Sequence, residues 1–175
     1  IAVTLNGTYT VGVGGNYTTL TAAVAAYNTA CLTGPVIFSL TDATYPSETF
    51  PITVNNASAN SVNTLTIRPA SGVSATLTGA LANNALVRIL SNYVTIDGSN
   101  NGSSSRNLTI SNTSVTGPSV VLIGSTGTTP VTNATLKNTI IINGANTSSA
   151  IVVSDAGILG NAGYFSNITI QNNDI

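Results

Sequence analysis

The sequence contains no histidine, no methionine and no tryptophan, and it has only one cysteine. The absence of histidine excludes Ser-His-Asp and Cys-His catalysis as well as zinc ligation by histidine. The lone cysteine, Cys31, excludes an internal disulfide and any metal site built from several cysteines. We therefore expect neither a metal site nor a cofactor.

Charge is equally scarce, with four basic and five acidic residues among 175 and a net charge of −1. So few lysines and arginines form no basic patch, and we expect no nucleic-acid partner. The apolar residues never continue for the ~20 positions that a spanning helix needs, so we expect no membrane insertion. The length predicts one domain, residues 1–175, with a surface of uncharged threonine, serine and asparagine.

One short amphipathic helix is predicted near the N-terminus, over residues 18–31. Its apolar side chains recur at the spacing of a single helical face, formed by Leu20, Val24, Tyr27 and Cys31. Thr18 or Thr19 can cap its start, and Gly34 followed by Pro35 can end it. On this pattern we expect Cys31 to be a buried structural thiol.

The remainder of the chain, residues 35–175, alternates short apolar segments with glycine, asparagine, serine and proline, which is typical of an all-β domain. The predicted strands are 36–40, 50–54, 65–67, 75–77, 86–90, 94–96, 108–110, 120–123, 134–142, 151–153 and 168–170.

A three-residue motif recurs in these strands: an apolar residue, a threonine and a second apolar residue. Its central residues are Thr66, Thr95, Thr109, Thr135 and Thr169. Alternation directs the apolar pair inward and the threonine outward. Stacked coils would place each copy above the next, whereas the hairpins of a sandwich would not need one shared triplet. We therefore expect the five threonines to form one outward column.

Asparagines follow three copies of this motif at a fixed separation in the sequence. Asn112, Asn138 and Asn172 each lie two positions after the second apolar residue of their copy. Asparagine tolerates the left-handed backbone of a tight bend, and stacked amides can hydrogen-bond along a column. We predict that these three residues form a structural ladder at the end of the strand.

This combination resembles the right-handed parallel β-helix of the pectin-lyase-like superfamily. The stretch "NYTTLTAAVAAYNTACLTGPVIFSLTDATYPSETFPI" is similar to the superfamily's entry segment, in which a helix caps the first coil and a strand leads into a G-x-Y-x-E turn. Here Ala43 replaces the glycine, and Glu48 lies one position late. The resemblance implies an all-β right-handed parallel β-helix, or solenoid, with a short N-terminal capping helix.

A second stretch, "NYVTIDGSNNGSSSRNLTISNTS", resembles repeats in large, non-enzymatic bacterial cell-surface proteins. That resemblance implies a secreted or cell-surface location. No cap equivalent to the N-terminal helix is predicted after the last triplet, so we expect a fragment of a longer protein. The partner expected at this open end is a second copy or further coils of the same protein.

Three of the few charged residues fall in one predicted outward column, next to the threonines. Arg68, Asp97 and Lys137 each directly follow a triplet, and Tyr93 flanks the other side. One interpretation is a ladder of alternating charge that stabilises the sheet slightly. The other is a shallow groove in which these four residues bind a polysaccharide.

The carboxylates are spread along the chain with no Asp-Asp, Asp-x-Asp or Asp-x-x-Asp pair, so we predict no catalytic residue. The leading hypothesis is a non-enzymatic structural or adhesive β-helix module. The alternative is a carbohydrate-binding or polysaccharide-cleaving domain, similar to pectate lyases.

Overall fold

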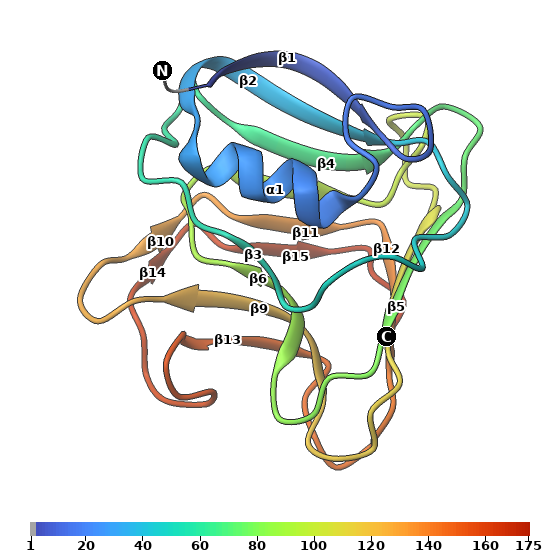
Figure 1. The fold of residues 1–175 in the computed structure, drawn as a ribbon. Helices are drawn as coiled ribbons and strands as arrows, with labels where there is room; N and C mark the ends of the chain where they lie inside the picture. Colours follow the sequence, from blue (N-terminus) through green and yellow to red (C-terminus); the bar gives the residue numbers. More distant parts are fainter. Residues whose placement is uncertain (1–2) are drawn as a thin grey trace.

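The computed structural model describes residues 3–175, which wind into a parallel β-solenoid of about five turns (Figure 1). The largest sheet, sheet A, takes one strand from each coil. Its strands, in spatial order, are β1 (Thr4–Val11), β2 (Cys31–Leu40), β4 (Leu65–Pro69), β7 (Val94–Asp97), β11 (Thr135–Lys137) and β15 (Thr169–Gln171).

Two further sheets form the other faces of the solenoid, and their strands pair in parallel with those of the neighbouring coils. Sheet B consists of β12 (Thr139–Asn143), β8 (Leu108–Asn112) and β5 (Ala75–Gly79). Sheet C consists of β13 (Ile151–Asp155), β9 (Ser119–Ser125), β6 (Ala85–Ile89) and β3 (Ile52–Val54). A short pair, β10 (Val131–Thr132) and β14 (Phe165–Ser166), precedes sheet A in the last two coils. The all-β solenoid prediction is confirmed.

The core is a set of aliphatic columns inside the coils. In sheet A, Ile67 lies beside Ile96, and Ile96 lies beside Leu136. All three side chains are at most 1% exposed. Burying an aliphatic side chain of this size contributes about 1.5–3 kcal/mol, so this repeated inward position accounts for much of the fold's stability.

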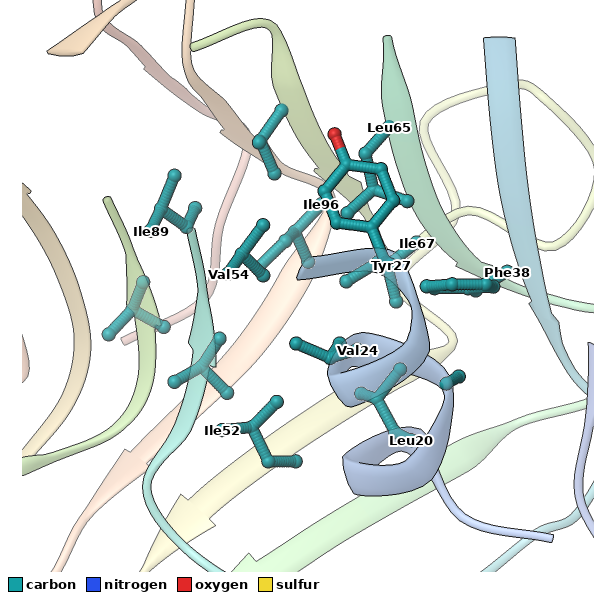
Figure 2. Packing of buried hydrophobic residues seen from close by; sticks show 14 of the residues in the cluster. Leu20, Val24, Tyr27, Phe38, Ile52, Val54, Leu65, Ile67, Ile89 and Ile96 are labelled. Atoms are coloured by element: carbon teal, nitrogen blue, oxygen red, sulfur yellow. The ribbon is translucent and has the colours of Figure 1, made fainter. Parts of the chain in front are cut away.

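The predicted helix is confirmed as α1 (Leu20–Thr29), with Thr19 as its N-cap. The Thr19 side chain accepts a hydrogen bond from Ala22 N. Figure 2 shows Leu20, Val24 and Tyr27 pointing into the cluster of buried residues of the first coils. The helix thus covers the core at the β1 end of the solenoid.

The prediction for Cys31 is wrong, because α1 ends before it. Cys31 is the first residue of β2, and its side chain is exposed. Gly34 and Pro35 lie inside that strand and do not end the helix. The residue between helix and strand, Ala30, already has extended backbone geometry. The helical spacing therefore persisted by chance one turn beyond the true helix end.

Two side chains from the next coil fasten α1 at both ends. Glu48 accepts hydrogen bonds from Leu20 N and Thr21 N, which satisfies amides that a helix leaves free at its start. Asn56 donates through Nδ2 to the carbonyl oxygens of Tyr27 and Ala30. The Glu48 of the modified entry turn is therefore a helix cap.

Several strand boundaries differ from the sequence-based prediction. The strand β1 was not predicted, and with β2 starting at Cys31 it places the first coil before residue 35. The short strands β10 and β14 were also missed. The predicted strand 134–142 is two strands, because Asn138 adopts a left-handed backbone with φ of 58° and turns the chain from sheet A to sheet B. No helix in the described range, residues 3–175, has the length and apolarity needed to cross a membrane.

The position predicted for Thr109 is wrong. Thr109 belongs to sheet B, where it pairs with Thr76 on one side and Ile140 on the other. Asn112 is likewise at the end of a sheet B strand, paired with Gly79 and Asn143. The same apolar–threonine–apolar triplet fits any face of the coil, so the pattern of residues does not distinguish sheet A from sheet B.

Candidate carbohydrate-binding face

The outward face of sheet A carries a row of threonines. Parallel register places Thr66 beside Thr95, Thr95 beside Thr135, and Thr135 beside Thr169. The four side chains are half-buried. Ile37 of β2 continues the row beyond Thr66. Four of the five predicted threonines therefore share one face.

A polar column runs beside the threonines along the same face. Its members are Ser39, Arg68, Asp97, Lys137 and Gln171. Ser39 pairs with Arg68. Lys137 pairs with both Asp97 and Gln171. The β4–β7 register, continued by one residue, sets Arg68 beside Asp97. Three charged residues that the sequence placed together are thus neighbours on successive coils.

Asp97 is held by three donors. Its Oδ2 lies 3.2 Å from Lys137 Nζ, and its Oδ1 accepts hydrogen bonds from Asn138 Nδ2 at 2.7 Å and from Ser99 N at 3.0 Å. The Asp97 side chain is 14% exposed and the Lys137 side chain 37%. Charge-assisted bonds of this kind fix a carboxylate in one orientation. Arg68, in contrast, is exposed.

Two of the three predicted asparagines, Asn138 and Asn172, form the ladder. Asn172 Nδ2 donates to Asn138 Oδ1 at 2.7 Å, and Asn138 in turn donates to Asp97. Both asparagines have a left-handed backbone. Asn112 takes no part, because its buried amide group instead bonds to the backbones of Leu81, Asn84 and Ser119.

Tyr93 begins a second aligned row on the opposite flank of the threonines. Tyr93, Asn133 and Asn167 occupy equivalent positions and have φ values of 54°, 55° and 55°. Asn167 Nδ2 donates to Asn133 Oδ1 at 2.6 Å. The Tyr93 side chain is half-buried, and the residue lies directly before β7, two positions before Thr95. The sequence signal for this second ladder was an asparagine two residues before the triplet's threonine.

A separate cleft of about 480 Å³ lies at the first turn after β2 and is lined in part by Asp42, Thr44 and Tyr45. Its polar groups hold the turn together: Val13 N donates to Asp42 Oδ2 at 2.8 Å, and the Tyr45 hydroxyl donates to Val11 O at 2.7 Å. Burial raises the pKa of the Tyr45 phenol. Within residues 3–175, no group of three or more His, Cys, Asp or Glu side chains lies close enough together to hold a metal ion.

Comparison with known proteins identifies the fold through structure alone. No family model matches the sequence, and no curated protein sequence matches it significantly. Among solved structures, the chain is similar to the pectin methylesterase from Aspergillus niger in deglycosylated form, with a TM-score of 0.57 and 16% sequence identity. The match covers 99% of this chain and 60% of the methylesterase chain.

This likeness extends over nearly all of the described coils, so it bears on the whole architecture and not on a single motif. An identity of 16% does not carry an activity from one protein to the other. What agrees is the path of the chain: successive parallel strands wound about one apolar axis. The chain therefore has the predicted fold, a right-handed parallel β-helix like that of this methylesterase.

Proposed function

We propose that this chain binds a polysaccharide along the outward face of sheet A without cleaving it. The observation that carries the proposal is the alignment of Arg68, Asp97 and Lys137 on successive coils of one open face. Neighbouring strands lie about 4.8 Å apart, so these groups form a linear polar track. A linear track fits an extended chain of hydroxyl-rich sugars better than a compact ligand.

The two flanks of the track supply different contacts. The half-exposed hydroxyls of Thr66, Thr95 and Thr135 can exchange hydrogen bonds with sugar hydroxyls. Tyr93, directly before β7, offers an aromatic group at the start of this face, and the guanidinium of Arg68 offers donors in a planar fork. The face therefore combines donors, acceptors and one aromatic group at regular spacing.

The surroundings of Asp97 support binding over cleavage. Retaining and inverting glycosidases use two carboxyl groups roughly 5–10 Å apart, one of which must exchange protons. The charged neighbours of Asp97 in its column are the cations Arg68 and Lys137. With Lys137, Asn138 and Ser99 as donors, the Asp97 carboxylate serves as an anchor that orients the Lys137 ammonium group.

Binding of a polysaccharide implies a secreted or cell-surface location, where polysaccharides are accessible. This location is part of the proposal. It predicts binding to intact cell-wall or capsular polysaccharide, which can be measured by sedimenting the protein with insoluble material.

Affinity electrophoresis and calorimetry with neutral and acidic polysaccharides test the proposal. We expect Arg68→Gln and Tyr93→Ala each to weaken binding about tenfold, which corresponds to about 1.4 kcal/mol. Thr95→Val on sheet A should weaken binding, whereas Thr109→Val on sheet B is the matched control and should not. Equal effects of the two threonine changes would contradict binding on sheet A.

The same samples can be assayed for cleavage or for ester hydrolysis, with and without calcium. New reducing ends, unsaturated ends or released alcohol would overturn the non-cleaving proposal if they vanished in Asp97→Asn. Product that persists in Asp97→Asn and co-purifies with the protein through a second purification step would overturn the proposal as well.

A rigid structural or adhesive module is the second candidate function. The observation that favours it is the unbroken parallel pairing of sheet A across six strands, from β1 to β15. Such stacking makes a stiff rod from a repeated contact between neighbours. Absence of binding to every polysaccharide tested, in a protein that unfolds cooperatively, would favour this candidate over the first.

A further inference from the structure

The loop between β7 and β8, residues 98–106, is organised around the side chain of one exposed asparagine, Asn101. Its Oδ1 accepts hydrogen bonds from Ser103 Oγ at 2.6 Å, Ser99 Oγ at 2.9 Å, Ser103 N at 3.0 Å and Ser105 Oγ at 3.2 Å. Because a backbone N–H only donates, the accepting atom is the amide oxygen and not the amide nitrogen. Four donors therefore converge on one amide oxygen at the surface.

This arrangement favours a reaction between Asn101 and the residue that follows it, Gly102. A glycine leaves its backbone nitrogen free to approach the carbon of the preceding side-chain amide. Negative charge develops on the amide oxygen during that attack, and donors already directed at the oxygen stabilise it. A Cβ at Gly102 would meet no atom within 4 Å, so the loop does not crowd the attacking residue. Within residues 3–175, neither Gly102 N nor Asn101 Nδ2 makes a hydrogen bond that would restrain it.

We propose that Asn101 is a site of spontaneous modification, which converts to aspartate and isoaspartate through a cyclic imide with Gly102. In the first step a bond forms between Gly102 N and Asn101 Cγ, the Cγ–Nδ2 bond breaks, and ammonia leaves with the proton of the glycine amide. Water then opens the imide at one of its two carbonyl carbons. Opening at the side-chain carbonyl gives aspartate, and opening at the main-chain carbonyl gives isoaspartate.

A second Asn–Gly pair, Asn143–Gly144, has its hydrogen bonds arranged the opposite way. Asn143 Nδ2, which would have to leave, donates to Ala145 O at 3.0 Å, Ser148 O at 3.1 Å and Ser148 Oγ at 3.2 Å. Asn143 Oδ1 is buried and has no hydrogen-bond partner in the described part of the chain. A Cβ at Gly144 would meet Ser114 O, so the glycine is packed against the backbone that follows β8. These contacts disfavour both the attack and the loss of ammonia.

The third and last Asn–Gly pair of the sequence, Asn6–Gly7, lies within β1. Gly7 pairs with Val36 of β2, and the Asn6 side chain lies against Gly34, where a Cβ would meet Asn6 Oδ1. Strand pairing restrains the glycine that would have to attack. We therefore expect this pair, like Asn143–Gly144, to react more slowly than Asn101.

The products would alter the surroundings of Asp97. Ser99, which donates through Oγ to Asn101, also donates through N to Asp97 Oδ1 at 3.0 Å. Further along the loop, Ser103 O accepts a hydrogen bond from Asn138 Nδ2 at 3.3 Å. Isoaspartate lengthens the main chain by one carbon between these two attachments, and either product adds a negative charge next to Ser99. The modification itself does not depend on polysaccharide binding.

Peptide mapping by mass spectrometry tests this inference on the unaltered protein. Trypsin cleavage after Arg88, Arg106 and Lys137 separates the three pairs into peptides 1–88, 89–106 and 138–175. After incubation of the folded protein in mildly alkaline buffer, we expect Asn101 to be converted at least about tenfold faster than Asn6 or Asn143. Equal rates at the three pairs, or an unchanged Asn101, would overturn the proposal.

The same incubation in concentrated urea separates the effect of the fold from that of the local sequence. The unfolded chain lacks both the converging donors at Asn101 and the packing at Asn143, so the three rates should converge. A preference for Asn101 that persisted in urea would assign it to the neighbouring residues in the sequence and would overturn the structural account.

Serine substitutions test whether the donors assist the reaction. Ser103→Ala combined with Ser105→Ala removes two hydroxyl donors, and we expect conversion of Asn101 to slow at least about threefold. Ser104→Ala is the matched control, because Ser104 is exposed in the same loop and its hydroxyl does not bond to Asn101. A double variant that reacts as fast as Ser104→Ala, or faster, would show that the hydroxyls do not activate Asn101.

Discussion

Asn138 and Asp97 lie on neighbouring coils and are joined by a hydrogen bond of 2.7 Å from Asn138 Nδ2 to Asp97 Oδ1. Asn138 also sits at the corner where the chain passes from sheet A to sheet B, with φ of 58°. One residue therefore makes a left-handed bend and orients the carboxylate at the centre of the proposed binding face. The two roles can be separated by substitution.

We expect Asn138→Gly to preserve the bend and lose the side-chain bonds, whereas Asn138→Ala should lose both. The hydrogen bonds to Asp97 and Asn172 are worth roughly 1–2 kcal/mol together, and the left-handed backbone should cost alanine roughly 1 kcal/mol more. Urea denaturation measures both differences. Equal stability of the two variants would show that the bend is unstrained for alanine.

Substitution of Glu48 should destabilise α1, although the helix lies far from Glu48 in the sequence. Glu48 accepts hydrogen bonds from Leu20 N and Thr21 N, so Glu48→Ala leaves two amides at the start of α1 without this partner. We expect a loss of roughly 1–3 kcal/mol in unfolding free energy, with faster hydrogen exchange confined to α1. Asp174→Asn, a change at an exposed carboxylate far along the chain, is the control and should shift stability by less than about 0.5 kcal/mol.

Tyr27 predicts a loss of stability at alkaline pH. It is fully buried, and burial raises its pKa to about 12 from an ordinary value of 10.0. The unfolded chain therefore loses this proton before the folded protein does. The Tyr27 contribution is complete below pH ~10 and declines as the pH rises toward ~12, by about 2–3 kcal/mol in total.

Tyr27→Phe isolates this contribution from those of the other tyrosines. The Tyr27 hydroxyl is buried without a hydrogen-bond partner, so the variant should be at least as stable as the wild type at pH 7. Above pH ~10 the variant should become progressively more stable than the wild type. Parallel stability curves for the two proteins between pH 7 and 12 would contradict a buried, protonated Tyr27.

The sequence predicted the coils better than their faces. An apolar–threonine–apolar triplet states which side chains point inward, and for this reason alternation alone correctly aligned Thr66, Thr95, Thr135 and Thr169. Thr109 was misplaced because a sheet B strand obeys the same alternation and ends at a similar corner. The register between coils depends on the lengths of the turns. Because the turns share neither a length nor a sequence pattern, the sequence did not predict which sheet each triplet joins.

The sequence likewise predicted only part of the charged site. Lys137 and Asp97 were placed together because both directly follow a triplet, and their 3.2 Å contact follows from the shared register. The part played by Asn138 in holding Asp97 was not predicted, because the triplet pattern indicated only a ladder of asparagines. Gly98 lies against the same corner, where a Cβ atom would meet Asn138 O, and this close approach brings the Asn138 amide within reach of Asp97.

Equivalent core positions in a middle coil and in the last coil should differ strongly in their contribution to stability. Ile96 is 1% exposed and is enclosed by coils on both sides, so Ile96→Ala should cost about 2–5 kcal/mol. Ile170→Ala should cost less than about 1.5 kcal/mol, because Ile170 is already 44% exposed. Urea denaturation of the two variants compares these costs, and similar costs would mean that the Ile170 side chain is enclosed in solution.

Tyr93 offers a test in which stability and binding should move in opposite directions. Its φ of 54° is unfavourable for a bulky aromatic residue, and the equivalent positions in the next coils are Asn133 and Asn167, which tolerate that backbone. Tyr93→Asn should therefore raise the unfolding free energy by roughly 0.5–1 kcal/mol, and the new amide can extend the ladder that Asn167 and Asn133 form. The same change removes the aromatic ring and should weaken polysaccharide binding about tenfold. Because a destabilised protein can lose binding through unfolding alone, a variant that gains stability and loses affinity assigns the loss to the ring. A Tyr93→Asn variant that binds as tightly as the wild type would remove Tyr93 from the proposed face.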